Sequence, residues 1–138
     1  MRMTAAIRAR RLGRWSMAVA FCATAASAFA ADFDGSKPLI CSAIEANDCA
    51  IGGCQMGIAE DINVPQFIRL DFVAKTINAR GRTAPMQSQG RADGMLAVQG
   101  FEGGRAYSIT ISEASGKLVG AIAGDEEGFV VFGACTPL

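Results

Sequence analysis

The stretch "GFVVFGAC", residues 128–135, decides the fold that the sequence predicts. It is an almost unbroken apolar run that finishes on Cys135. A short run of this kind is typical of a strand that is covered on both faces. We therefore expect residues 128–135 to be an interior strand whose end is held by its cysteine.

Strand signals continue through the preceding sequence. Residues 106–112 ("AYSITIS") alternate Tyr107, Ile109 and Ile111 with hydroxyl side chains, and residues 66–72 ("QFIRLDF") alternate in the same way. A period of two indicates half-buried strands. Weaker strand signals lie at residues 38–48, 76–80, 83–90, 95–101 and 117–124, whereas residues 49–63 indicate a loop with one helical turn near residues 59–62.

These segments make about eight short strands with tight links, among them a hairpin signal at Asp93 and Gly94. Short links force neighbouring strands to pair antiparallel. A meander curled until its first and last strands meet removes exposed edges. We predict one small all-β meander, a closed or nearly closed barrel of lipocalin-like form, with a two-layer β-sandwich as the alternative. The expected core is Leu70, Phe72, Leu96, Val98, Ile109, Ile111, Phe129 and Phe132.

Residues 1–30 have the order of a secretory signal peptide. Five arginines precede an apolar stretch, and "SAFA" places Ala28 and Ala30 at the positions that a signal peptidase reads. The stretch is shorter than the ~20 residues of a membrane-spanning helix. We expect cleavage after Ala30, a flexible lead-in at residues 31–37, a single β domain at residues 38–138, and a periplasmic or secreted protein with no membrane span after cleavage.

Charge narrows the range of partners. Removing the five arginines of residues 1–30 leaves 8 basic against 13 acidic residues, a net charge of −5. Such a chain is repelled by nucleic acid and by anionic membranes. We therefore predict no nucleic-acid partner.

Four cysteines remain after cleavage: Cys41, Cys49, Cys54 and Cys135. An even number in a small exported domain indicates two disulfides. The short loop between Cys49 and Cys54 favours their pairing, which leaves Cys41 for Cys135, although three pairings are possible. A zinc site is the alternative, but the spacing is unlike that of paired zinc knuckles. We predict no metal and no cofactor.

The sequence contains no histidine, which excludes Ser-His and Cys-His nucleophilic sites. The acidic residues 125–127 are interpreted as a solvated turn, and the glycines of residues 100–105 as a loop. Arg69 and Asp71 lie on the polar face of a strand. They are interpreted either as an exposed pair or as ligand-binding residues inside the barrel. No catalytic residue is predicted.

Three segments carry a resemblance: "DFDGSKPLICSAIEANDC" (32–49), "INVPQFIRLDFVAKTI" (62–77) and "GFVVFGACTP" (128–137). With them the chain resembles an uncharacterised family of small exported bacterial proteins that share an ADFDG-K-P-L start and an F-G-A-C-T-P end. The resemblance implies an exported, periplasmic bacterial protein and no particular activity.

Three functions follow as hypotheses. The first is a non-enzymatic binding module for a small apolar ligand or an envelope protein. The second is a structural or inhibitor-like interaction protein with a filled core, and the third is an enzyme that uses carboxylates. A cavity of several hundred Å³ would favour the first, since ligand pockets usually measure roughly 300–1,000 Å³.

Overall fold

A computed structural model of the chain describes residues 32–60 and 64–138. These residues form an all-β fold, and no helix occurs among them. The helical turn expected near residues 59–62 lies partly outside the described residues. The strands are β1 (Leu39–Ala50), β2 (Gly53–Gly57), β3 (Phe67–Asp71), β4 (Thr76–Ala79), β5 (Arg82–Pro85), β6 (Ser88–Ala92), β7 (Met95–Glu102), β8 (Arg105–Ser112), β9 (Lys117–Ala123) and β10 (Glu127–Pro137).

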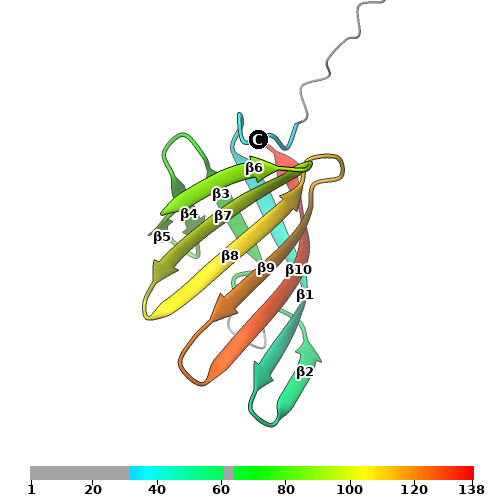
Figure 1. The fold of residues 1–138 in the computed structure, drawn as a ribbon, viewed down its shortest axis with the longest axis vertical. Coiled ribbons are helices and arrows are strands. Elements are labelled where there is room, and N and C mark those ends of the chain that lie inside the picture. Colours follow the sequence, from blue (N-terminus) through cyan, green and yellow to red (C-terminus); the bar gives the residue numbers. More distant parts are fainter. Residues whose placement is uncertain (1–31, 61–63) are drawn as a thin grey trace, which may run out of the picture.

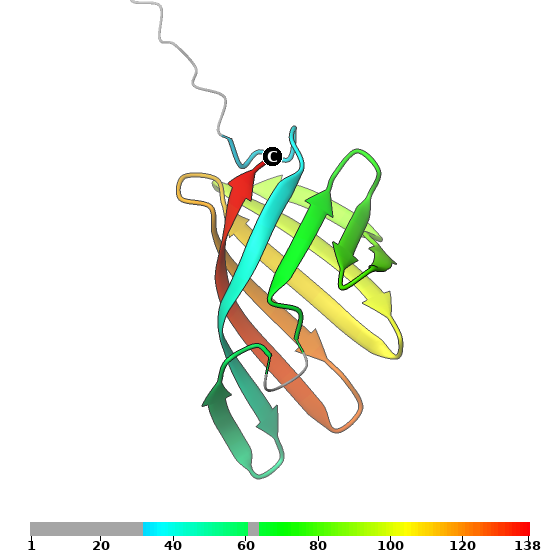
Figure 2. The same cartoon turned by 180° about the vertical axis from the view of Figure 1, so that it is seen from behind.

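The described strands form one antiparallel sheet in the order β5-β4-β3-β1-β10-β9-β8-β7-β6, and β2 pairs with the far part of β1. The sheet curls strongly, so that β3, β4 and β5 lie across from β7 and β8 (Figures 1 and 2). The predicted barrel-like all-β meander is therefore confirmed, and it is built from a single sheet.

The meeting of the first and last strands, β1 and β10, is also confirmed. Their register runs from Leu39 opposite Pro137 to Ala50 opposite Glu127, with a β-bulge between Ala43 and Glu45. The two edges of the sheet lie elsewhere, at β5 and β6. The chain crosses from one edge to the other through residues 86 and 87, and the sheet is a strongly curled half-barrel.

Two parts of the predicted strand pattern were wrong. The segment 83–90, expected as one weak edge strand, is divided into β5 and β6, which are the two edges of the sheet. Pro85 ends β5, consistent with its missing backbone N–H group. Residues 53–57, expected as part of a loop, form β2, where Cys54 is the cross-strand neighbour of Cys49.

Tight hairpins join β6 to β7 and β7 to β8. Asp93 and Gly94 have φ values of 52° and 76°, and Gly103 and Gly104 have φ values of 58° and 81°. Positive φ at both central residues gives the turn twist that matches paired strands. The Asp-Gly hairpin prediction is confirmed, and the glycine-rich loop before Arg105 is a second hairpin of the same kind.

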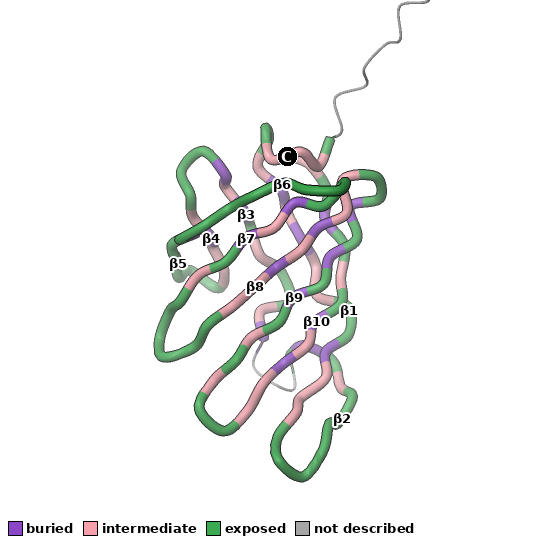
Figure 3. The backbone as a smooth tube through the Cα atoms, in the orientation of Figure 1, coloured by how far each residue is buried: buried purple, intermediate pink, exposed green. Residues whose placement is uncertain are grey.

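Buried residues alternate with half-buried or exposed ones along β7, β8 and β9, as the alternation of residues 106–112 predicts (Figure 3). They pack together in the core on the concave face of the sheet. Seven of the eight expected core residues are buried, among them Leu70, Val98 and Ile111. Phe132 is the exception, with 42% of its surface exposed. The prediction that β10 is covered on both faces was wrong: Phe129 and Val131 are buried, whereas Phe132 on the other face is not covered by residues 32–60 or 64–138.

Apolar side chains pack together at the end of the barrel where β1 begins, the upper end in Figure 1. Phe33 packs against a cluster that includes Leu39, Leu96 and Met86. A Cβ on Gly116 would lie 2.6 Å from the ring of Phe33, so this glycine provides room for the aromatic side chain. Residues 32–37, predicted as a flexible lead-in, therefore contribute to the core through Phe33.

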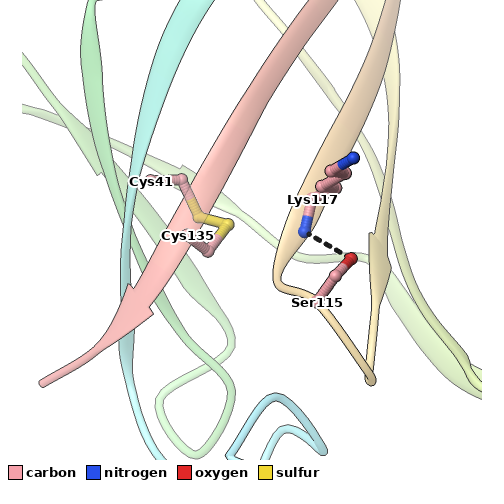
Figure 4. Close-up of a disulfide and its surroundings, with 4 residues drawn as sticks. All are labelled: Cys41, Ser115, Lys117 and Cys135. Atoms are coloured by element: carbon pink, nitrogen blue, oxygen red, sulfur yellow. Dashed lines mark hydrogen bonds between the residues drawn. A yellow bond between two sulfur atoms is a disulfide. The ribbon is translucent and has the colours of Figure 1, made fainter.

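The structure contains the two disulfides that the cysteine spacing favours, Cys41–Cys135 and Cys49–Cys54. Cys41 and Cys135 are direct cross-strand neighbours on β1 and β10, and both are buried (Figure 4). The backbone nitrogen of Cys135 donates to the carbonyl of Gly116, away from β1. The pair is thus a non-hydrogen-bonded one, where antiparallel strands approach most closely.

Candidate ligand-binding cavity

The concave face encloses a cavity of about 280 Å³ below the packed upper end. Its walls come from inward positions of β1, β3, β4, β5, β7, β8, β9 and β10. Most of the lining side chains are aliphatic or aromatic, among them Ile68, Ile77, Ile109, Leu118, Ile122, Phe129 and Val131. The interior is therefore packed at one end and hollow at the other.

Small residues keep the cavity open. Gly120, Ala43, Ala79 and Ala84 are all part of the lining. A Cβ on Gly120 would lie 3.8 Å from Val131 and 3.9 Å from Ile109, which is ordinary van der Waals contact. A larger side chain at position 120 would consequently extend into the hollow rather than clash with the wall.

Tyr107 links β8 to β5, one of the two edge strands of the sheet. Its hydroxyl donates to the carbonyl oxygen of Pro85 on β5, and its ring lies over Gly100 on β7. Any Cβ at position 100 would overlap the tyrosine, so a glycine is required there. The cavity is thereby walled on the side where the strands are not paired.

Two effects raise the pKa of Tyr107. Desolvation raises the pKa of Tyr107 above its ordinary value, and the negative charge of Glu102 raises it further. Both effects favour the neutral phenol, because each disfavours the phenolate anion. The negative charge of Glu102 therefore acts on Tyr107, a side chain of the cavity wall.

Charged residues stand at the lower rim of the cavity. Glu102 is the last residue of β7, and Arg105 is the first residue of β8. They are cross-strand neighbours, and both belong to the lining of the cavity. Arg105 forms an ion pair with Glu127 of β10, and its guanidinium carbon lies 5.5 Å from the ring centroid of Phe129. The rim therefore combines a paired cation with carboxylates.

The predicted ligand-binding residues Arg69 and Asp71 lie away from this cavity. They project from β3 on the face opposite Leu70, with 3.9 Å between their nearest charged atoms. One oxygen of Asp71 accepts a hydrogen bond from the backbone nitrogen of Ala74 in the β3–β4 turn. The structure thus places them as an exposed pair at a turn.

The acidic turn is divided between two roles. Asp125 and Glu126 lie in the β9–β10 turn, as expected of a solvated segment, whereas Glu127 begins β10 and pairs with Arg105. No group of three or more possible metal ligands occurs within residues 32–60 and 64–138. In the same part of the chain, no helix has the length and hydropathy of a membrane span.

Sequence reasoning missed Glu102 and Arg105 as cavity residues, although the signal was present. The inward set Tyr107, Ile109 and Ile111 extends to Arg105 at the same period of two. On β7 the inward set Leu96 and Val98 extends through Gly100 to Glu102. Extending the same alternation to the ends of β7 and β8 would have placed Glu102 and Arg105 on the concave face.

Comparison with known proteins adds no relative. No family model matches the sequence, and no curated protein or solved structure matches the chain.

Proposed function

We propose that this chain is an exported, non-enzymatic binding protein that holds a small apolar ligand inside a lipocalin-like barrel. The cavity of about 280 Å³ with its aliphatic and aromatic walls is the observation that supports this function. Its volume is close to the lower end of the usual range for ligand pockets, roughly 300 Å³. A cavity of roughly 150 Å³ is already large enough for a benzene-sized molecule.

The two disulfides support a location in an oxidising compartment, the periplasm or the extracellular space. We propose that residues 1–30 are the signal that directs the chain there. N-terminal sequencing of the mature protein from the periplasmic fraction tests this assignment. A first residue of Ala31 supports it, and a retained Met1 contradicts it.

Titration with n-hexanol, observed through methyl resonances by NMR, tests the binding function. We expect saturable shifts at Ile109, Ile122 and the other lining methyl groups, and none at the exposed Ile44 and Ile51. Shifts confined to exposed methyl groups would contradict the proposal, because they would indicate surface association.

A cavity-filling variant makes the test specific. Gly120→Val directs a branched side chain into the hollow, whereas the control Gly90→Val adds the same side chain on the exposed edge strand β6, where a Cβ meets nothing within 4 Å. We expect Gly120→Val to abolish saturable binding while the fold persists, as shown by the NMR spectrum. Retained hexanol affinity in the folded Gly120→Val variant would contradict binding in this cavity.

A second candidate function is docking on an envelope protein through the β1–β2 hairpin. The disulfide Cys49–Cys54 ties this hairpin, and Ile51 and Met56 are highly exposed on it. A photo-crosslinking amino acid at position 56, compared with one at position 115 in the β8–β9 turn, tests this function in the periplasm. A discrete crosslinked protein at position 56 alone supports docking, and equal products at both positions contradict it.

A further inference from the structure

The two hairpin ends beside the cavity have an excess of negative charge. Ala106 pairs with Ala123, so the β7–β8 and β9–β10 hairpin ends lie side by side (Figure 1). Residues 102–105 and 124–127 bring together four carboxylates and one guanidinium. The two hairpin ends therefore carry a net charge of −3, which favours cations beside Glu102. Arg80 of the β4–β5 turn is a further cation near the cavity, where its guanidinium donates to the carbonyl oxygen of the lining residue Val64.

The one cation of these two hairpin ends is already engaged. Arg105 pairs with Glu127 and lies over the ring of Phe129. A ligand carboxylate at Arg105 would share the guanidinium with Glu127 and would stand beside Glu102 as well. Like charges at such short range are unfavourable, so the rim discriminates against an anionic head group.

The carboxylate that lines the cavity is, in contrast, available. Within residues 32–60 and 64–138, Glu102 forms neither a hydrogen bond nor an ion pair through its side chain. It shares the concave face with Arg105, Tyr107 and Ile109, as the strand register requires. A ligand whose apolar part fills the cavity would bring its head group to this carboxylate.

We propose that the ligand is an apolar amine, with its protonated amino group at Glu102 and its hydrocarbon part against Ile109 and Leu118. This inference rests on the proposed binding function and specifies the chemical class of the ligand. The cavity provides the apolar contacts, and Glu102, supported by the other rim carboxylates, provides the charge selection.

Three ligands of equal chain length and different head group test the inference: n-hexylamine, n-hexanol and n-hexanoate. Their dissociation constants are measured at pH 7 by the methyl NMR titration. We expect hexylammonium to bind about three- to fivefold more tightly than hexanol, the selectivity of one exposed ion pair. Hexanoate is expected to bind more weakly than hexanol, and hexanoate affinity equal to or above that of hexylammonium would overturn the proposal.

Two variants test whether Glu102 is the source of the preference for hexylammonium over hexanol. Glu102→Gln should reduce the ratio of hexylammonium affinity to hexanol affinity to about one. The control Glu126→Gln removes a carboxylate of the neighbouring turn that does not line the cavity, and it should retain most of the selectivity. Unchanged selectivity in Glu102→Gln would overturn the assignment. Saturable hexanol binding without amine preference rejects this inference alone, whereas no binding of any of the three rejects the proposed function as well.

Discussion

The two disulfides should contribute unequally to stability, because they close loops of very different length. Cys41 and Cys135 are 94 residues apart in the sequence, and Cys49 and Cys54 are 5 apart. In the chain-entropy model the long loop corresponds to about 4–5 kcal/mol and the short loop to about 2 kcal/mol at 25 °C. The long bridge also joins the strands β1 and β10, which hold the two halves of the sheet together.

Two double variants separate these contributions. Cys41→Ala with Cys135→Ala should lower the free energy of unfolding by about 4–5 kcal/mol, and Cys49→Ala with Cys54→Ala by about 2 kcal/mol. Since small domains have only about 5–15 kcal/mol in total, the first variant should lose roughly a third or more of its stability.

Urea unfolding followed by far-ultraviolet circular dichroism measures both losses, and the short-bridge variant controls for the loss of two sulfur atoms. Equal losses, or a larger loss from the short bridge, would refute the assignment of the stabilisation to the long loop.

Three further predictions concern single sites. Gly133→Ala would place a Cβ into the backbone of β1 at the bulge, so urea titration should show a loss of about 1–3 kcal/mol, and an unchanged midpoint would contradict this close approach. Tyr107 is the one tyrosine of the sequence, so absorbance titration reports its pKa directly. Glu102→Gln should lower that raised pKa while leaving it above the ordinary value, since burial is the larger cause, and an identical titration curve would contradict the effect. Stability should fall as the pH rises above 10, because the unfolded chain ionises its tyrosine first. The pKa of Glu113 is held below 4.5 by its hydrogen bond to Arg91, so the stabilising pair exists above that pH and is lost as the pH falls through the lower folded value. Arg91→Gln should raise this pKa in a carboxyl NMR titration, and an unshifted resonance would show that the pair does not form in solution.

Most of the strands could be predicted from the sequence because the sheet has one buried face. Ile109 and Ile111 alternate with hydroxyl side chains, and this alternation is a direct consequence of burial on the concave side alone. The disulfide pairing was also accessible, since a short loop favours Cys49–Cys54 and leaves the remaining two cysteines for each other.

Other elements carry no such signal. The strand β2 reads "GCQMG", with exposed residues and no alternation, and it pairs with β1 in the hairpin that Cys49–Cys54 ties. Phe132 is exposed because no other part of the described chain covers that face of β10, and a local apolar run does not reveal this.

The candidate site was partly predictable. Placing Leu70 inside already required Arg69 and Asp71 to point outward, so their interpretation as cavity residues conflicts with the strand period. Glu102 and Arg105 follow from the same rule applied to β7 and β8. The volume of the hollow did not follow, because it depends on how closely eight strands approach around Gly120 and its neighbours.

The pairing of β1 with β10 has a consequence for the connectivity of the chain. The backbone nitrogen of Leu138 donates to the carbonyl oxygen of Pro38 at 2.9 Å, so a short linker could join the two ends of the domain. With the chain then opened between β5 and β6, the sheet order becomes the order of the sequence, with β2 as an added hairpin arm. In such a circular permutant, β1 and β10 become local partners, so folding should be faster. The Cys41–Cys135 bridge would then close only a short loop and contribute far less, although the barrel around it would be the same.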